Sequence, residues 1–114
     1  MDRSTAVVNR HHKIPYDVYV GRGTPWGNPY PLSEGGREAV IRRYEEYLRG
    51  NAELLGRLPE LQGKVLACSC APQPCHGDIL AAFTDSLAET GELPDESVTD
   101  KLFPEPKRPQ LSFG

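Results

Sequence analysis

Three short apolar segments have the pattern of β-strands. Residues 5–9 and 17–20 are rich in β-branched and aromatic side chains, and Gly21 ends the second segment. Residues 64–68 form an uninterrupted apolar run after the turn residues Gln62 and Gly63, which predicts a strand covered on both faces. The chain therefore has the material for a small, largely buried sheet.

Helical periodicity separates these strands. The first helix is predicted to open at Ser33 or at Gly35-Gly36 and to end at Gly50, because apolar residues recur there at helical spacing: Val40, Ile41, Tyr44, Tyr47 and Leu48. A shorter helix is expected over residues 52–58, before Pro59. A third begins at Cys75 or His76 and stops at Gly91, with Ile79, Leu80, Phe83 and Leu87 on its buried side.

Strands followed by helices indicate an α/β fold. We expect a small single domain over residues 1–91, with a mainly parallel, Rossmann-like sheet flanked by helices. Residues 92–114 hold four prolines and scattered charges, so we expect an extended or docked tail. Its apolar side chains give it the means to dock on the body or on a second copy in a homodimer: Leu102, Phe103, Leu111 and Phe113.

Charge and composition narrow the classes of partner. The formal net charge of −3 argues against a broad basic surface for nucleic acid, although a local basic patch stays open. Arginines do crowd the first helix, but Glu38, Glu45 and Glu46 interleave with them, which is typical of a solvated face. No apolar run has the length of a membrane span and the start of the chain lacks a signal-peptide pattern, so we expect a cytoplasmic protein without membrane contact.

The segment from Cys68 to His76 gathers all three cysteines of the chain beside a histidine. In a reducing cytoplasm they point to metal binding or chemistry more than to a disulfide framework. Cys68, Cys70, Cys75 and His76 make a complete tetrahedral donor set for zinc, although adjacent side chains at Cys75 and His76 diverge.

Two other interpretations of the same segment stay open. At a helix start, Cys75 would face an anion or become a reactive thiolate, with His76 as general acid or base. Asp78 would then either cap the helix or orient His76. Alternatively, the cysteines are small core residues and nothing more.

A second candidate segment is the loop that follows the second predicted strand. Arg22 suits a phosphate or carboxylate, and Gly23 and Gly27 permit close backbone approach. Trp26 can stack on a base or sugar, and Asn28 can read a hydrogen-bonding edge. In the alternative, Trp26 fills the core and the glycines make turns. Both segments follow strands, and ligands of parallel sheets bind beyond the strand carboxyl ends.

At these motifs the chain resembles the family catalogued as domain of unknown function 4326, over roughly residues 5–88. The resemblance rests on five segments: residues 18–23, 26–29, 61–66, 68–70 and 75–78. Ser69 departs from the aromatic residue that many relatives carry. The resemblance implies a fold unit found in bacteria and their viruses, without a settled activity. The strand-Cys-loop-Cys-His-helix unit is also similar to family 488 of unknown function, where a carboxylate replaces Cys70, which weakens the metal interpretation.

These observations favour a protein that binds a nucleotide or a nucleotide-derived molecule. If the protein is an enzyme, this molecule is its substrate. The ligand would be held by Arg22, Gly23, Trp26, Gly27, Asn28, Cys68 and Cys70, with Cys75, His76 and Asp78 as catalytic candidates. The sequence does not rank catalysis against plain binding. The alternative is a zinc-stabilised module that binds a protein or a nucleic acid without catalysis.

Overall fold

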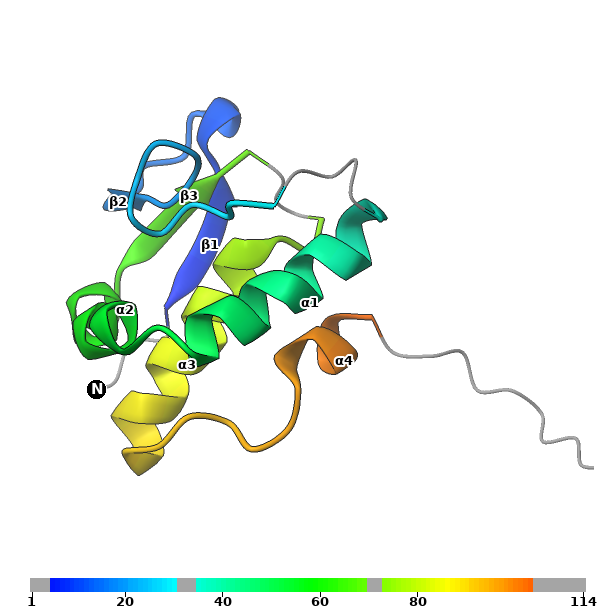
Figure 1. Cartoon of the computed structure of the whole chain (residues 1–114). Coiled ribbons are helices and arrows are strands. Elements are labelled where there is room, and N and C mark those ends of the chain that lie inside the picture. The colour runs from blue at the N-terminus through cyan, green and yellow to red at the C-terminus, as the bar shows by residue number, and fades with distance from the viewer. Residues whose placement is uncertain (1–4, 31–34, 70–72, 104–114) are drawn as a thin grey trace, which may run out of the picture.

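Three parallel strands form the centre of the molecule (Figure 1). The structure, a computed structural model, describes residues 5–30, 35–69 and 73–103. Strand β3 (Val65–Cys68) lies between β1 (Ala6–Asn9) and β2 (Val18–Tyr19), so the sheet order is β1-β3-β2. The prediction of a small α/β fold with a parallel sheet is confirmed.

The central strand is buried on both faces. Val7 and Val18 flank Leu66 in the register and join it in the hydrophobic core. Ala67 points to the opposite face, because side chains alternate along a strand, and both Leu66 and Ala67 are 0% exposed. The uninterrupted apolar run therefore lies where its pattern predicts.

Helices supply the rest of the core. Helix α3 (His76–Thr90) packs on β1 and β3, and α1 (Gly36–Arg49) packs on α3. Between α1 and β3 the chain forms α2 (Ala52–Arg57) and a 3-10 turn, Leu58–Leu61. The largest fully buried side chains from these helices include Ile41, Tyr44, Leu48, Leu58, Ile79, Leu80 and Phe83. The predicted stripes of α1 and α3 thus meet each other.

The segment after Gly91 is docked as far as Phe103. It forms the short helix α4 (Val98–Leu102), whose Val98 and Thr99 are buried against α1. The sequence analysis did not predict this helix, because one turn leaves too short a pattern to read. Leu111 and Phe113 lie outside the described residues. Among the described residues, no helix has the length and apolar character needed to cross a membrane.

Candidate functional site

A cleft of about 460 Å³ opens where the three strands end. Arg10 follows β1, Gly21 and Arg22 follow β2, and Ser69 follows β3. The beginnings of α1 and α3 close the cleft from the other side. It therefore lies at the carboxyl edge of a parallel sheet, where such sheets bind ligands.

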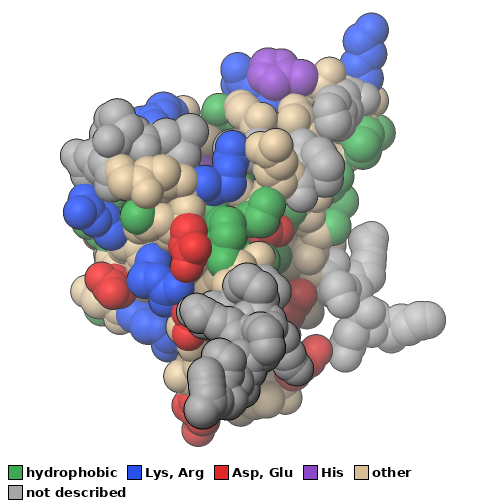
Figure 2. Space-filling view, turned by 90° about the vertical axis from the view of Figure 1, so that its right-hand side faces the viewer, with side chains coloured by type: hydrophobic (Ala, Val, Ile, Leu, Met, Phe, Trp, Pro, Cys, Tyr) green, Lys and Arg blue, Asp and Glu red, His purple; other side chains and the backbone are tan. Residues whose placement is uncertain are grey.

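The charged side chains of the cleft are all cationic. Arg10, Arg22 and Arg37 line it, and its described lining residues include no Asp or Glu. The carboxylate next to the lining is that of Asp78, which accepts a hydrogen bond from the Cys75 N–H. The Arg10 guanidinium lies 4.9 Å from the Tyr19 ring centre, and Arg37 donates to the Pro74 carbonyl at 3.1 Å. In Figure 2 blue and purple side chains occupy the top of the molecule, the end at which the strands finish, and red ones lie further down. This end of an acidic protein is locally positive.

Arg37 occupies an electrostatically poor position. It lies in the first turn of α1, the end of a helix where backbone N–H groups already create positive potential. Among the described residues, the lining of the cleft holds no carboxylate that would compensate this charge. An anion in the cleft would offset the repulsion between the Arg37 guanidinium and the positive end of α1.

His76 is fixed by backbone. Its Nε2 lies 2.6 Å from the carbonyl oxygen of Val20, just after β2, so Nε2 carries the proton and donates. Burial is the main influence and lowers the pKa of His76, so the ring is neutral near pH 7. The ring also makes an edge-to-face contact with Tyr44, with 5.1 Å between the ring centres, and this contact holds it in place. Nδ1 is then the ring atom available as a proton acceptor.

Asp78 caps α3, which is one of the two roles that the sequence suggests for it; the other is orientation of His76. The backbone N–H of Cys75 donates to Asp78 Oδ2 at 2.9 Å, which secures the first turn of α3. Burial of its carboxyl group raises the pKa of Asp78, and the hydrogen bond from Cys75 opposes that rise. Asp78 therefore defines where α3 begins, and with it the positions of Cys75 and His76.

Cys68 and Cys75 are brought together by the fold. Their Sγ atoms are 3.0 Å apart, and the two residues are 1% and 2% exposed. The hydrogen bond to Cys68 and then burial raise the pKa of the Cys75 thiol. The interpretation of Cys75 as a reactive thiolate at a helix start would require a lowered pKa. The opposite direction follows because the neighbouring sulfur and the loss of solvent outweigh the effect of the helix.

The structure describes three of the four residues that could bind zinc: Cys68, Cys75 and His76. Cys70 falls in residues 70–72, outside the described residues. Of the other three, two sulfurs meet, while His76 turns its Nε2 to the Val20 carbonyl. Within the described ranges, no three His, Cys, Asp or Glu side chains form a group suited to a metal ion.

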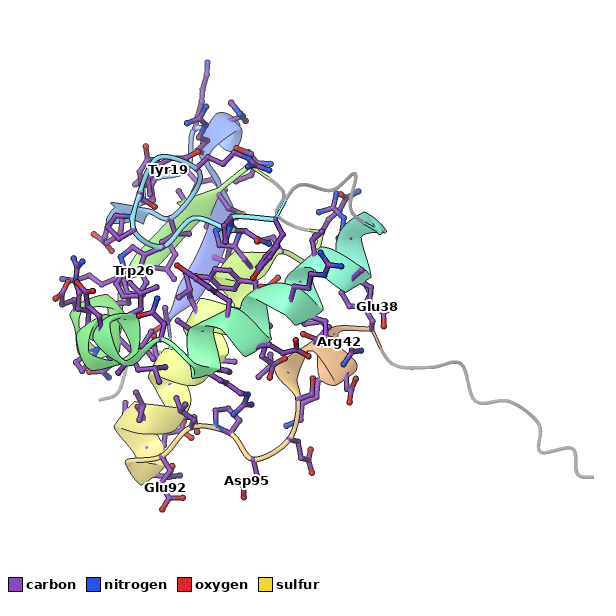
Figure 3. All side chains as sticks on the ribbon, in the orientation of Figure 1. Tyr19, Trp26, Glu38, Arg42, Glu92 and Asp95 are labelled. Atoms are coloured by element: carbon purple, nitrogen blue, oxygen red, sulfur yellow. The ribbon has the colours of Figure 1, made fainter. Side chains whose placement is uncertain are left out.

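The loop after β2 divides its expected ligand-binding residues between cleft and core. Arg22 and Asn28 line the cleft, whereas Trp26 is 4% exposed and belongs to the core cluster. Figure 3 shows Trp26 well below Tyr19, on the side of α2, and the Arg57 guanidinium lies 5.5 Å from its ring centre. This burial favours the packing role of Trp26 over stacking on a ligand.

Asn28 and Gly27 shape the loop. Asn28 Nδ2 donates to the Val40 carbonyl at 3.2 Å, and its Oδ1 accepts from the Tyr30 N–H at 2.9 Å. The amide nitrogen of Asn28 thus holds the loop on α1, and its amide oxygen closes a turn within the loop. A Cβ atom at Gly27 would lie 2.7 Å from the Gly21 carbonyl oxygen, so the chain must approach itself closely there. Gly23 has a φ of +91°, a conformation that favours glycine.

Several cleft residues were not among the predicted site residues. Arg10, Tyr19 and Tyr30 line it without having been singled out, and Arg37 was assigned to a solvated helix face. Their common signal is position: Arg10 and Tyr19 lie at strand ends, Tyr30 lies in the loop after β2, and Arg37 lies at the start of α1. That signal becomes readable only when the strand order is known.

Comparisons with known proteins identify the family of the chain. The family model described as "Domain of unknown function (DUF4326)" matches residues 6–86. An uncharacterised 12.4 kDa protein encoded between nrdA and td in Enterobacteria phage T4 is 37% identical over 89 residues, covering 75% of this chain and 82% of that protein. No solved structure matches the chain. The expected presence of such proteins in a bacterial virus is confirmed, and the chain belongs to the DUF4326 family.

Proposed function

We propose that the cleft binds a small nucleotide or nucleotide-derived anion. The observation that carries the proposal is the set of three arginines, Arg10, Arg22 and Arg37, around a cleft without a described carboxylate. In a chain with a net charge of −3, this local excess of cations creates a positive potential that attracts an anionic ligand.

The arginines suit phosphate groups. They come from three separate places: the end of β1, the loop after β2 and the start of α1. A planar guanidinium forms paired hydrogen bonds with phosphate oxygens, and three of them around one cleft can surround a phosphate or diphosphate. The start of α3 also borders the cleft through Cys75 and His76, but the Asp78 carboxylate offsets its positive backbone potential, so the arginines are the main source of positive charge.

The remaining lining suits the rest of a nucleotide. Tyr19 and Tyr30 are partly buried aromatic residues at the cleft, and Val40 and Ile41 of α1 add apolar surface. Tyrosine rings offer faces on which a base can stack. The volume of about 460 Å³ lies within the ordinary range for small-molecule sites. Trp26 does not contact the ligand in this proposal, because it is buried in the core.

We also infer a Rossmann-like relation between ligand and sheet, with the phosphates beyond the carboxyl ends of the strands. Processing of the ligand would use His76, which lines the cleft and whose Nδ1 is the ring nitrogen left to accept a proton when Nε2 donates to Val20. The buried thiols of Cys68 and Cys75 suit a reducing compartment such as the cytoplasm.

A zinc-stabilised module that binds a protein or nucleic acid is the second candidate. One observation favours it: Cys68 and Cys75 present two sulfurs to the same point. Two thiolates would need further ligands, and Cys70 carries the third thiol of the chain. Metal analysis of untagged protein decides this directly. A zinc content near one ion per chain, with unfolding on chelation, would make zinc the better account.

Thermal shift and calorimetry with a panel of ligands test the nucleotide proposal. The panel holds nucleoside mono- and diphosphates, cyclic nucleotides and dinucleotide cofactors, with the matching nucleosides as uncharged controls. We expect stabilisation by phosphate-bearing ligands alone, and its loss in Arg22→Ala but not in Arg42→Ala, because Arg42 pairs with Glu38 and Asp100 away from the cleft. An absence of response across the whole panel would refute the proposal.

A further inference from the structure

The thiol pair is a second chemical feature that ligand binding does not explain. Cys68 ends β3, the central strand, and Cys75 is the residue before α3. Their Sγ atoms approach to 3.0 Å, although neither residue is part of a disulfide. The two residues are separated along the chain by the segment that leaves the sheet and enters the helix.

Both sulfurs are held in place by well-formed structure. Cys68 is in register with Asn9 of β1, so its backbone is fixed within the sheet. Cys75 is fixed by its N–H bond to Asp78 and by its place at the start of a helix of 15 residues. A Cβ at Gly77 would lie 3.2 Å from Val7 Cγ1 and 3.4 Å from Cys75 Sγ, so the first turn of α3 packs closely against β1 beside the sulfur.

The pair is also reachable by a small reagent. Cys68 and Cys75 both line the cleft, although they are 1% and 2% exposed. A small uncharged molecule can enter a cleft of about 460 Å³, whereas a bulky peptide disulfide would have to open the wall to reach the sulfurs.

We propose that Cys68 and Cys75 form a reversible disulfide in the wall of the cleft when the protein meets a peroxide. The sulfurs need to approach by only about 1 Å to reach the length of an S–S bond. The fold therefore supplies the proximity that most cysteine pairs lack.

The reaction balances with hydrogen peroxide as the oxidant. The thiolate of one cysteine attacks a peroxide oxygen, the O–O bond breaks, and the sulfur becomes a sulfenic acid as hydroxide leaves. The sulfur of the second cysteine then attacks the sulfenic sulfur, forming the S–S bond and releasing water. In total, two thiols and one peroxide give one disulfide and two waters. A small dithiol restores both thiols and leaves as its own disulfide.

The raised pKa of the Cys75 thiol bears on the rate of this step and not on its outcome. Peroxide reacts with thiolate, so a buried thiol reacts slowly near neutral pH. The rate of oxidation should consequently rise as the pH is increased, while the pair of residues linked stays the same.

The test counts thiols on the full chain after chelation, peroxide treatment and removal of excess peroxide. Alkylation under denaturing conditions and intact mass then report the remaining thiols. The wild type has three cysteines, and we expect one to remain alkylatable, with a dithiol restoring all three. Cys70→Ser is the informative variant: it should still lose both of its thiols. Cys68→Ser and Cys75→Ser should each keep two.

Three outcomes would overturn the proposal. Cys70→Ser could retain both thiols after peroxide, wild type could gain oxygen atoms instead of losing two hydrogens, or the untreated protein could hold zinc that unfolds it on removal. The central readouts use wild type and Cys70→Ser, neither of which alters a residue of the buried pair. A failure of Cys68→Ser or Cys75→Ser to fold would therefore leave the test intact. Nucleotide binding plays no part in it.

Discussion

Two groups of charged side chains near α1 differ in whether the protein itself supplies their partners. Beside α4, the buried Glu45 accepts hydrogen bonds from the N–H groups of Val98 and Thr99, each at 2.9 Å. It also accepts from the hydroxyls of Thr99 and Ser97, at 2.7 Å and 3.1 Å, and pairs with Arg49 at 2.9 Å. At the cleft, three arginines face no described carboxylate.

The difference separates structural charge from charge kept for a ligand. Glu45 needs nothing beyond its own chain, because its carboxylate already has donors on both oxygens. Arg42 is similar: it pairs with Glu38 and Asp100, and Figure 3 shows Arg42 and Glu38 on the same side of α1, near α4. Arg22 and Arg37 have no such partner in the lining of the cleft. We infer that the unbalanced group is the functional one.

Substitutions of Trp26 test whether this residue of the loop after β2 has a structural role or a ligand-binding role. Trp26→Ala should lower the free energy of unfolding by about 3–5 kcal/mol, because a large buried aromatic side chain is lost. Chemical denaturation measures this change. Trp26→Phe should cost less and leave ligand affinity unchanged. A Trp26→Phe protein of normal stability with greatly weakened binding would show that the ring contacts the ligand.

Glu45 tests the structural side of the comparison. Glu45→Ala should lower the free energy of unfolding by about 2–3 kcal/mol, because it leaves buried donors of α4 without an acceptor. Glu46→Ala, an exposed neighbour on the same helix, is the matched control and should stay within about 0.5 kcal/mol of wild type. Equal effects of the two substitutions in denaturant titrations would contradict the role given to Glu45.

The same carboxylate predicts a dependence on pH. Burial favours the protonated form, but the bonds from Thr99, Val98 and Arg49 prevail and lower the pKa of Glu45 to about 2. A lowered pKa means that Glu45 stabilises the fold fully above its ordinary value of 4.5 and less as pH falls toward about 2. Melting curves across this range should show that loss in wild type. Glu45→Gln should flatten the dependence, and an unchanged slope would argue against this assignment.

Single arginine substitutions should have the smallest effects on stability and a selective effect on binding. Arg22→Ala should weaken binding of a phosphate ligand by about tenfold, the loss of one hydrogen-bonded charge pair of about 1.5 kcal/mol. Arg42→Ala removes a paired arginine outside the cleft and should leave affinity unchanged. Calorimetric titration of both variants measures the difference. Equal weakening by the two would point to general charge and not to the cleft.

The sequence predicts the elements better than their meeting points. The stripe through Val40, Tyr44 and Leu48 and the apolar run through Leu66 identify α1 and β3, because local periodicity determines which face is buried. The helix start at His76 follows as well, since Asp78 caps it. Helix α4 escapes prediction because Glu45, far along the chain, supplies the acceptor that holds it.

The candidate site shows the same limit. Arg22, Cys75 and His76 are found from the residue types in their segments, and all three line the cleft. Arg10 and Arg37 could not be assigned to it, because they come from the far ends of different elements. The chemistry of Trp26 suggested a ligand contact, but packing decides its position, and packing is a property of the assembled fold.

The most direct test of the account compares adenosine diphosphate with adenosine by calorimetry, on wild type and on the Arg22→Ala/Arg37→Ala double variant. We predict that wild type binds the diphosphate and not the nucleoside, and that the double variant loses about 100-fold in affinity or more, since two charged contacts disappear. Undiminished binding of the diphosphate by a folded double variant, or equal binding of adenosine by wild type, would contradict the claim that the unbalanced arginines hold an anionic ligand.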